Sequence, residues 1–153
     1  MVKPPSGSSL RRAGAIRPAA VLDASTALSW LFEDERDEQA IAMANAVVVN
    51  GAIVPPLFRW EIQNALLAAV RRKRISLDRA TESLAALDEL GIAVDGFILT
   101  SPLATGLGFT QRFGLTAYDA AYLELAVRRS VPLMTRDEKL KRAATDLRLL
   151  WKP

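Results

Sequence analysis

The chain has 153 residues and contains neither cysteine nor histidine. Disulfides are therefore impossible, and an intracellular, cytoplasmic location is the natural expectation. Metal sites built from thiolates or imidazoles are excluded, as are catalytic triads with a histidine base. No apolar run approaches the roughly 20 residues that a membrane span requires, so we expect no contact with a membrane. Any metal binding or acid–base chemistry must therefore rely on oxygen ligands.

The composition is typical of a globular protein, because 50% of the residues are hydrophobic and 24% are charged. The length suits one domain with a substantial core. Residues 1–18 differ from the rest: they are rich in proline, glycine, serine and arginine and contain no acid. They also lack the apolar centre of a secretory signal. We interpret residues 1–18 as a flexible basic tail, with a transit peptide as the alternative, and residues 19–153 as the folded domain.

The apolar pattern alternates between short strands and longer helices. Strands are expected over residues 19–23, 53–54, 92–94, 131–134 and 147–151. Helices are expected over residues 25–32, 33–49, 57–74, 77–90, 98–113, 117–129 and 138–144. Strands separated by one or two helices predict an α/β architecture with a mainly parallel sheet.

Four carboxylates lie inside or beside apolar segments, where an unpaired acid is costly to bury: Asp23, Glu61, Asp119 and Asp137. Asp23 and Asp137 follow predicted strands, and Asp119 opens the helix that precedes the strand before Asp137. Ligand sites of open α/β sheets form outside the carboxyl ends of strands. If the acids converge there, a hard cation such as Mg²⁺ or Mn²⁺ relieves their repulsion. The pattern therefore points to metal-dependent phosphoester chemistry.

Each acid also has a structural interpretation. Asp23 and Asp137 are good N-caps for the helices that follow them. Asp119 fits a capping box with Thr116. Glu61 is a mid-helix glutamate, and most such residues are solvated. For each acid taken alone, the structural role is as reasonable as a role in a metal site. The joint arrangement of the four acids, however, favours a shared site.

The net charge is +3, from 20 basic and 17 acidic residues. A pocket of four acids on an otherwise positive protein suits a polyanionic ligand, although a modest basic excess is also common in proteins without such a ligand. The end of the long helix carries a basic run that either contacts phosphates or complements the helix dipole. The main candidates for RNA contact are Arg71, Arg72, Lys73, Arg74 and Arg136, followed by Arg112, Arg128, Arg129 and Lys139.

Four motifs occur in the order and spacing of PIN-domain nucleases. They are V-L-D-A-S at 21–25, E-I-Q-N-A-L at 61–66, L-T-A-Y-D-A-A-Y-L-E-L-A at 115–126 and L-M-T-R-D-E-K-L at 133–140. The last two most closely resemble the VapC toxins of prokaryotic toxin–antitoxin pairs, and the resemblance covers residues 19–151. It implies a three-layer α/β/α PIN-like fold and a metal-dependent endoribonuclease that uses Mg²⁺ or Mn²⁺.

The same resemblance implies roles for individual residues. It makes Asp23, Asp119 and Asp137 direct metal ligands, and Glu61 a pocket acid that acts through water. Supporting hydroxyls are then expected from Ser25 and Thr135. A cation-activated water would attack the phosphorus of RNA, leaving a 5′-phosphate and a 3′-hydroxyl.

The expected partners also follow from the resemblance: an RNA substrate, a second copy in a homodimer, and a VapB-like antitoxin whose tail covers the acidic pocket. An apolar segment supplies either part of such an interface or simply core residues: Leu28, Trp30, Leu31 and Phe32.

Other functions remain open at this point. The chain is alternatively a PIN-domain RNA-processing nuclease without an antitoxin, or a non-catalytic RNA-binding PIN domain. The non-catalytic alternative predicts lost acids, and all four are present. A phosphoacceptor receiver-like domain ranks lower, because the adjacent acids and late lysine that it requires are absent at Leu22-Asp23 and Thr135-Arg136.

Overall fold

The computed structural model describes residues 20–96 and 102–153 of the chain. Its centre is a four-stranded sheet of β1 (Val21–Leu22), β2 (Ala52–Val54), β3 (Ile92–Val94) and β4 (Leu133–Met134). The strand order is β3-β2-β1-β4, and every pairing is parallel. The predicted parallel sheet is therefore confirmed. The predicted tail, residues 1–18, lies outside the described residues, as does the start of the helix expected over 98–113.

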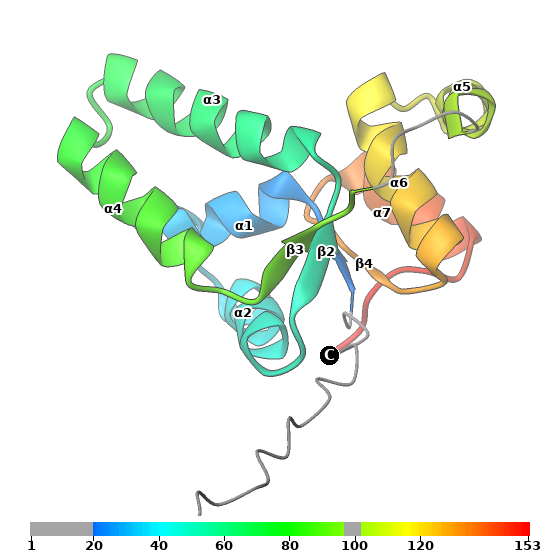
Figure 1. Ribbon diagram of the computed structural model, residues 1–153, viewed down its shortest axis with the longest axis horizontal. Helices are drawn as coiled ribbons and strands as arrows, with labels where there is room; N and C mark the ends of the chain where they lie inside the picture. The colour runs from blue at the N-terminus through cyan, green and yellow to red at the C-terminus, as the bar shows by residue number, and fades with distance from the viewer. Residues whose placement is uncertain (1–19, 97–101) are drawn as a thin grey trace, which may run out of the picture.

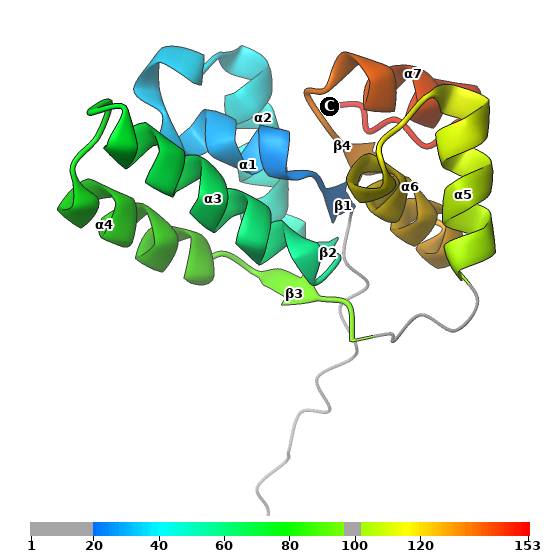
Figure 2. The same ribbon diagram turned by 90° about the horizontal axis from the view of Figure 1, so that it is seen from above.

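Helices cover both faces of this sheet (Figures 1 and 2). One group lies on one side and the other group on the opposite side, in the three-layer arrangement expected for a PIN-like fold. The first group is α1 (Ala24–Leu31), α2 (Glu38–Asn50), α3 (Leu57–Arg71) and α4 (Leu77–Asp88), and the second is α5 (Pro102–Phe113), α6 (Ala117–Arg129) and α7 (Glu138–Asp146). Within the described part of the chain, no helix has the length and apolar character needed to cross a bilayer.

The central strands are buried on both faces. Val21, Leu22, Leu133 and Met134 are fully buried, which explains why these strands appear in the sequence as continuous apolar runs rather than alternating ones. From β1 the chain builds the sheet outward through β2 and β3, and then returns to place β4 on the other side of β1. The direction in which strands are added to the sheet therefore reverses between β1 and β4. Open α/β sheets form their ligand sites at such a point.

Three predicted boundaries differ from the structure, two of them because of local backbone conformation. Residues 33–35 form a short 3₁₀ turn, and α2 begins only after Asp37, whose carboxylate accepts a hydrogen bond from the Ala40 N–H at 2.8 Å. The helix predicted to run to residue 74 ends at Arg71, because Lys73 adopts a left-handed conformation with φ of 57°. The strand predicted over 147–151 is reduced to one parallel bridge between Leu133 and Leu150.

Candidate active site

Asp23 follows β1 directly and is almost completely buried, with 5% of its surface exposed. Its N–H donates to the Met134 carbonyl at 2.9 Å, which fixes the end of β1 against β4. Its carboxylate oxygen Oδ2 accepts hydrogen bonds from the hydroxyls of Thr135, at 2.8 Å, and Ser25. Although Asp23 occupies the N-cap position of α1, its side chain makes no capping bond. The side-chain hydrogen bonds to the carboxylate thus come from hydroxyl groups.

The two hydroxyls connect Asp23 to the loop that follows β4. Ser25 Oγ accepts from the Arg136 N–H at 3.1 Å, and Thr135 Oγ1 accepts from the Asp137 N–H at 3.1 Å. Each hydroxyl thus accepts a hydrogen bond from a backbone N–H and donates one to Asp23. The predicted supporting roles of Ser25 and Thr135 consequently have a direct geometric basis.

Glu61 lies on α3 and is half-buried, so the alternative of a fully solvated surface glutamate is wrong. Its Oε2 accepts a hydrogen bond from the hydroxyl of Tyr122 on α6. Burial raises the pKa of Glu61, as do the negative charges of Asp23 and Asp119, while the bond from Tyr122 opposes this rise. Glu61, Asp23 and Asp119 are therefore electrostatic neighbours, although they come from three different helices or helix ends.

Asp119 makes the capping box predicted from the sequence. Thr116 Oγ1 accepts from the Asp119 N–H at 3.1 Å, and Asp119 Oδ2 accepts from the Thr116 N–H at 3.2 Å and from the Thr116 hydroxyl at 2.8 Å. The charge of Asp119 nevertheless raises the pKa of both Asp23 and Glu61. A capping role and a place beside the pocket thus coexist.

Asp137 stands at the rim. It is exposed and caps α7, because its Oδ1 accepts from the Leu140 N–H at 2.8 Å. It does not contribute to the pKa rise of Asp23 or Glu61. Its connection to the pocket runs through Thr135, the hydroxyl that binds Asp23. The fold therefore brings three of the predicted acids together electrostatically and places the fourth beside them on the β4–α7 loop.

Burial is the main cause of the raised pKa of Asp23, with a smaller contribution from the charge of Asp119. The hydroxyls of Ser25 and Thr135 act in the opposite direction, because they stabilise the ionised form. An ionised carboxylate in this position is thus unfavourable unless a positive charge approaches it.

The other buried acids are neutralised by arginine. Asp95 binds Arg128 at 2.6 Å and also Arg129, and Glu124 binds Arg128 at 2.8 Å. Among the described residues, neither lysine nor arginine pairs with any of the acids of the pocket: Asp23, Glu61 and Asp119. All other described acids are either exposed or paired. This uncompensated negative charge, carried entirely by hard oxygen donors, fits a divalent cation.

The carboxylates share a further feature of metal ligands. One oxygen of each is held by a hydrogen bond, as outer-shell partners hold ligating carboxylates. The held oxygens are Oδ2 of Asp23, Oε2 of Glu61, Oδ2 of Asp119 and Oδ1 of Asp137. Across residues 20–96 and 102–153, the second oxygen of each receives no hydrogen bond from a side chain, and no three acids stand close enough to hold one ion without moving.

The predicted RNA contacts divide into paired and unpaired groups. Arg74 binds Asp34 at 2.6 Å and Glu35 at 2.9 Å, and Arg136 binds both oxygens of Asp37 at 2.8 and 2.7 Å. By contrast, the exposed run at residues 71–73 has no ion pair within the described part of the chain. It lies about 15 Å along α3 from Glu61, at the usual rise of about 1.5 Å per residue.

One further expectation concerns the apolar segment around residues 28–32. The apolar segment for which an interface and the core were the two alternatives packs against the core: Phe32 is buried, and Leu28, Trp30 and Leu31 are partly buried against the core cluster. Tyr122 was part of the 115–126 motif but received no role. Its signal in the sequence was its position three residues after Asp119, on the same face of a helix. Tyr122 is fully buried, and burial and the charge of Glu61 raise its pKa, so the hydroxyl remains protonated.

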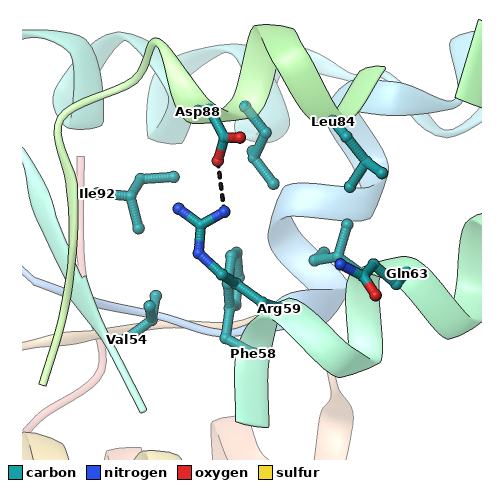
Figure 3. A pocket seen from close by; sticks show the side chains of 9 residues that line it. Val54, Phe58, Arg59, Gln63, Leu84, Asp88 and Ile92 are labelled. Carbon is teal, nitrogen blue, oxygen red and sulfur yellow. Dashed lines mark hydrogen bonds and ion pairs between the residues drawn. The ribbon is translucent and has the colours of Figure 1, made fainter. Parts of the chain in front are cut away.

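A groove between α3, α4 and the β2–β3 edge is distinct from this site (Figure 3). It is mainly apolar, and Arg59 and Asp88 form an ion pair of 2.5 Å across it. None of the predicted acids lines it. The candidate site is consequently the acidic region at the carboxyl ends of β1 and β4.

Comparison with known proteins agrees with this fold. The PIN domain family matches residues 20–146. Ribonuclease VapC1 of Mycobacterium tuberculosis is 35% identical over 106 residues, which cover 65% of this chain and 77% of that protein. Ribonuclease VapC3 of Pyrobaculum aerophilum is 31% identical over 121 residues, which cover 78% and 90%. A solved structure, "Crystal Structure of PAE2754 from Pyrobaculum aerophilum", superposes with a TM-score of 0.64 at 23% identity, over 85% of this chain and 87% of that one. The chain therefore belongs to the PIN-domain family of VapC ribonucleases.

Proposed function

We propose that the chain is the toxin of a VapBC-type pair, an endoribonuclease that hydrolyses RNA with the help of Mg²⁺ or Mn²⁺. Membership of the VapC ribonucleases supports the activity. The observation that supports the site is the group of Asp23, Glu61 and Asp119, which are the acids that are neither exposed nor paired with a base in the described residues. Asp23, Asp119 and Asp137 would hold the cation directly, and Glu61 through water.

A bound Mg²⁺ or Mn²⁺ would supply Lewis acidity at the phosphate and an activated water. The protein's own contribution is to orient the carboxylates. Ser25 and Thr135 fix Asp23, and Thr116 fixes Asp119, so the orientation of these two carboxylates is set before the substrate arrives. Burial of Asp23 lowers the local dielectric and strengthens its interaction with positive charge. Hydrolysis adds water across the bond between phosphorus and O3′, which leaves a 5′-phosphate and a 3′-hydroxyl.

The proposed partners are an RNA substrate, a VapB-like antitoxin and a second copy of the chain, and the place of action is the cytoplasm. Similarity to ribonucleases named VapC supports the RNA substrate and the antitoxin, whereas the second copy rests on the family resemblance alone. Exposed arginine and lysine at residues 71–73 are the proposed phosphate contacts, because they lie at the C-terminal end of the helix that carries Glu61 and have no acidic partner in the described residues. Light scattering of the purified chain, with and without a VapB-like antitoxin, tests the assembly.

The activity is tested by incubating an end-labelled RNA that contains stem-loops with the protein and Mn²⁺. Wild type should cut within the RNA and leave 5′-phosphates, whereas Asp23→Asn should be inactive because the charge on the central carboxylate is lost. Asp146→Asn is the matched control, since Asp146 is an exposed acid of α7. Equal cleavage by wild type and Asp23→Asn would contradict the proposal. Binding without cleavage by the wild type would favour the non-catalytic alternative.

A further inference from the structure

Tyr122 is a buried polar residue that the proposed mechanism does not yet use. It lies on α6 with 0% of its surface exposed, and its hydroxyl donates to Glu61 Oε2 on α3. Asp119 precedes it by three residues, so both side chains lie on one face of α6. The same helix thus carries one acid of the pocket and the donor that holds another.

The Tyr122 hydroxyl also lies near the start of α1. Its oxygen interacts with the N–H of Ala24, the first residue of α1, and the adjacent Asp23 is close enough for its charge to act on the phenol. The hydroxyl therefore binds α3 and lies near the start of α1 from its buried position on α6. Because the phenol has only one proton, donating it to Glu61 fixes the orientation of the hydroxyl.

Glu61 needs such a partner for physical reasons. It is half-buried and is repelled by Asp23 and Asp119. A glutamate side chain has several rotatable bonds, and repulsion would favour rotamers that point toward solvent. A bond from an immobile tyrosine holds Oε2 and leaves Oε1 without a side-chain donor among the described residues.

We propose that Tyr122 is a positioning residue, whose hydroxyl holds Glu61 in the pocket beside Asp23 and Asp119. This inference rests on the proposed function of that pocket. Tyr122 does not touch the reacting atoms; it acts through Glu61. Removing the hydroxyl while keeping the ring should therefore weaken the cation site and the chemical step without weakening RNA contacts elsewhere.

The decisive comparison is Tyr122→Phe with Tyr118→Phe. The chain has two tyrosines, and Tyr118 is 65% exposed, so its substitution is a matched control. Loss of a partner that orients a metal ligand typically lowers affinity or activity about 10- to 100-fold. Tyr122→Phe should lower kcat and Mn²⁺ affinity, measured by calorimetry, by about that factor, with KM for the RNA unchanged. Tyr118→Phe should match the wild type in all three measurements.

A double-mutant cycle separates positioning from a general structural effect. In a Glu61→Ala background, Tyr122→Phe should cause no further loss of Mn²⁺ affinity, because the partner is already absent. An equal loss in both backgrounds would show that the phenol acts through the fold and would overturn the proposal. The proposal would also be overturned if Tyr122→Phe kept the kcat and the Mn²⁺ affinity of the wild type.

A spectroscopic arm needs neither metal nor RNA. Labelling tyrosine with ¹³C at Cζ gives two NMR signals, and Tyr122→Phe assigns the one from Tyr122. Glu61→Ala should shift the Tyr122 signal and leave the Tyr118 signal in place. An unshifted Tyr122 signal would refute the contact. If the wild type failed to cleave RNA, the proposed function would fail, yet this arm would still decide whether Tyr122 holds Glu61.

Discussion

Replacing Asp23 with asparagine should separate activity from stability. The pKa of Asp23 is raised above its ordinary value of 3.8, mainly by burial, so its ionised form is disfavoured in the folded protein. Its contribution to stability is therefore complete at acid pH and is lost as the pH rises from about 3.8 through the raised folded-state pKa. Asparagine is neutral and still accepts from Ser25 and Thr135. In EDTA at neutral pH, Asp23→Asn should unfold at a higher temperature than the wild type.

Adding Mn²⁺ should make the wild type unfold at a higher temperature than Asp23→Asn. A ligand present at 100 times its dissociation constant stabilises the folded state by about 2.7 kcal/mol. For a domain of this size, that corresponds to an increase in the wild-type Tm of roughly 5–10 °C, at about 2–4 °C per kcal/mol. Asp23→Asn should gain little, because it lacks the charge that attracts the cation.

The measurement is differential scanning fluorimetry from pH 4 to 8, with EDTA or with saturating Mn²⁺. Asp146→Asn serves as the control for a change of net charge at an exposed position. The metal-free wild type should lose stability relative to Asp23→Asn as the pH rises. Lower stability of Asp23→Asn in EDTA, or equal Mn²⁺ stabilisation of both proteins, would refute the view that Asp23 is an uncompensated charge awaiting a cation.

Three further outcomes are expected. Thr135→Val removes the 2.8 Å hydrogen bond to the buried Asp23 carboxylate and should lower the free energy of unfolding by about 1–3 kcal/mol in urea titrations; an unchanged midpoint would contradict this. Asp95→Asn removes the charge that pairs with Arg128 at 2.6 Å, and it should lower Tm while leaving kcat unchanged. A variant that folds but is inactive would contradict this prediction. Alanine at residues 71–73 should raise KM for RNA and reduce the salt dependence of binding at constant kcat; an unaltered salt dependence would argue against phosphate contact there.

Local signals in the sequence were reliable where the interactions that they report are themselves local. Ser76 caps α4 by accepting from the Arg79 N–H at 3.1 Å, and Thr116 and Asp119 form the expected capping box. The continuous apolar runs correctly marked the strands on either side of β1. The strand predicted over 147–151 was wrong because strand pairing depends on a distant segment, and only one bridge to the sheet forms there.

In the candidate site, too, local features were predictable from the sequence and long-range contacts were not. Three acids were recognisable because a carboxylate after an apolar strand, or at the start of a helix beside one, is chemically conspicuous. Their ion-pairing state was not recognisable, because Arg74 and Arg136 bind acids 40 and 99 residues away. Nothing in a linear pattern distinguishes a basic residue that is committed to such a pair from one that is available to a phosphate.

The sequence by itself determined the chemistry that this protein can use: oxygen ligands without histidine or cysteine, and acids placed after apolar runs. It also indicated the parallel α/β architecture, since apolar runs and helix caps are patterns of residues close together in the chain. Only the tertiary structure decided which acids remain without a counter-charge and which hydroxyls hold them. Those properties depend on contacts such as Tyr122 with Glu61, 61 residues apart, which form only when the helices pack around the ends of β1 and β4.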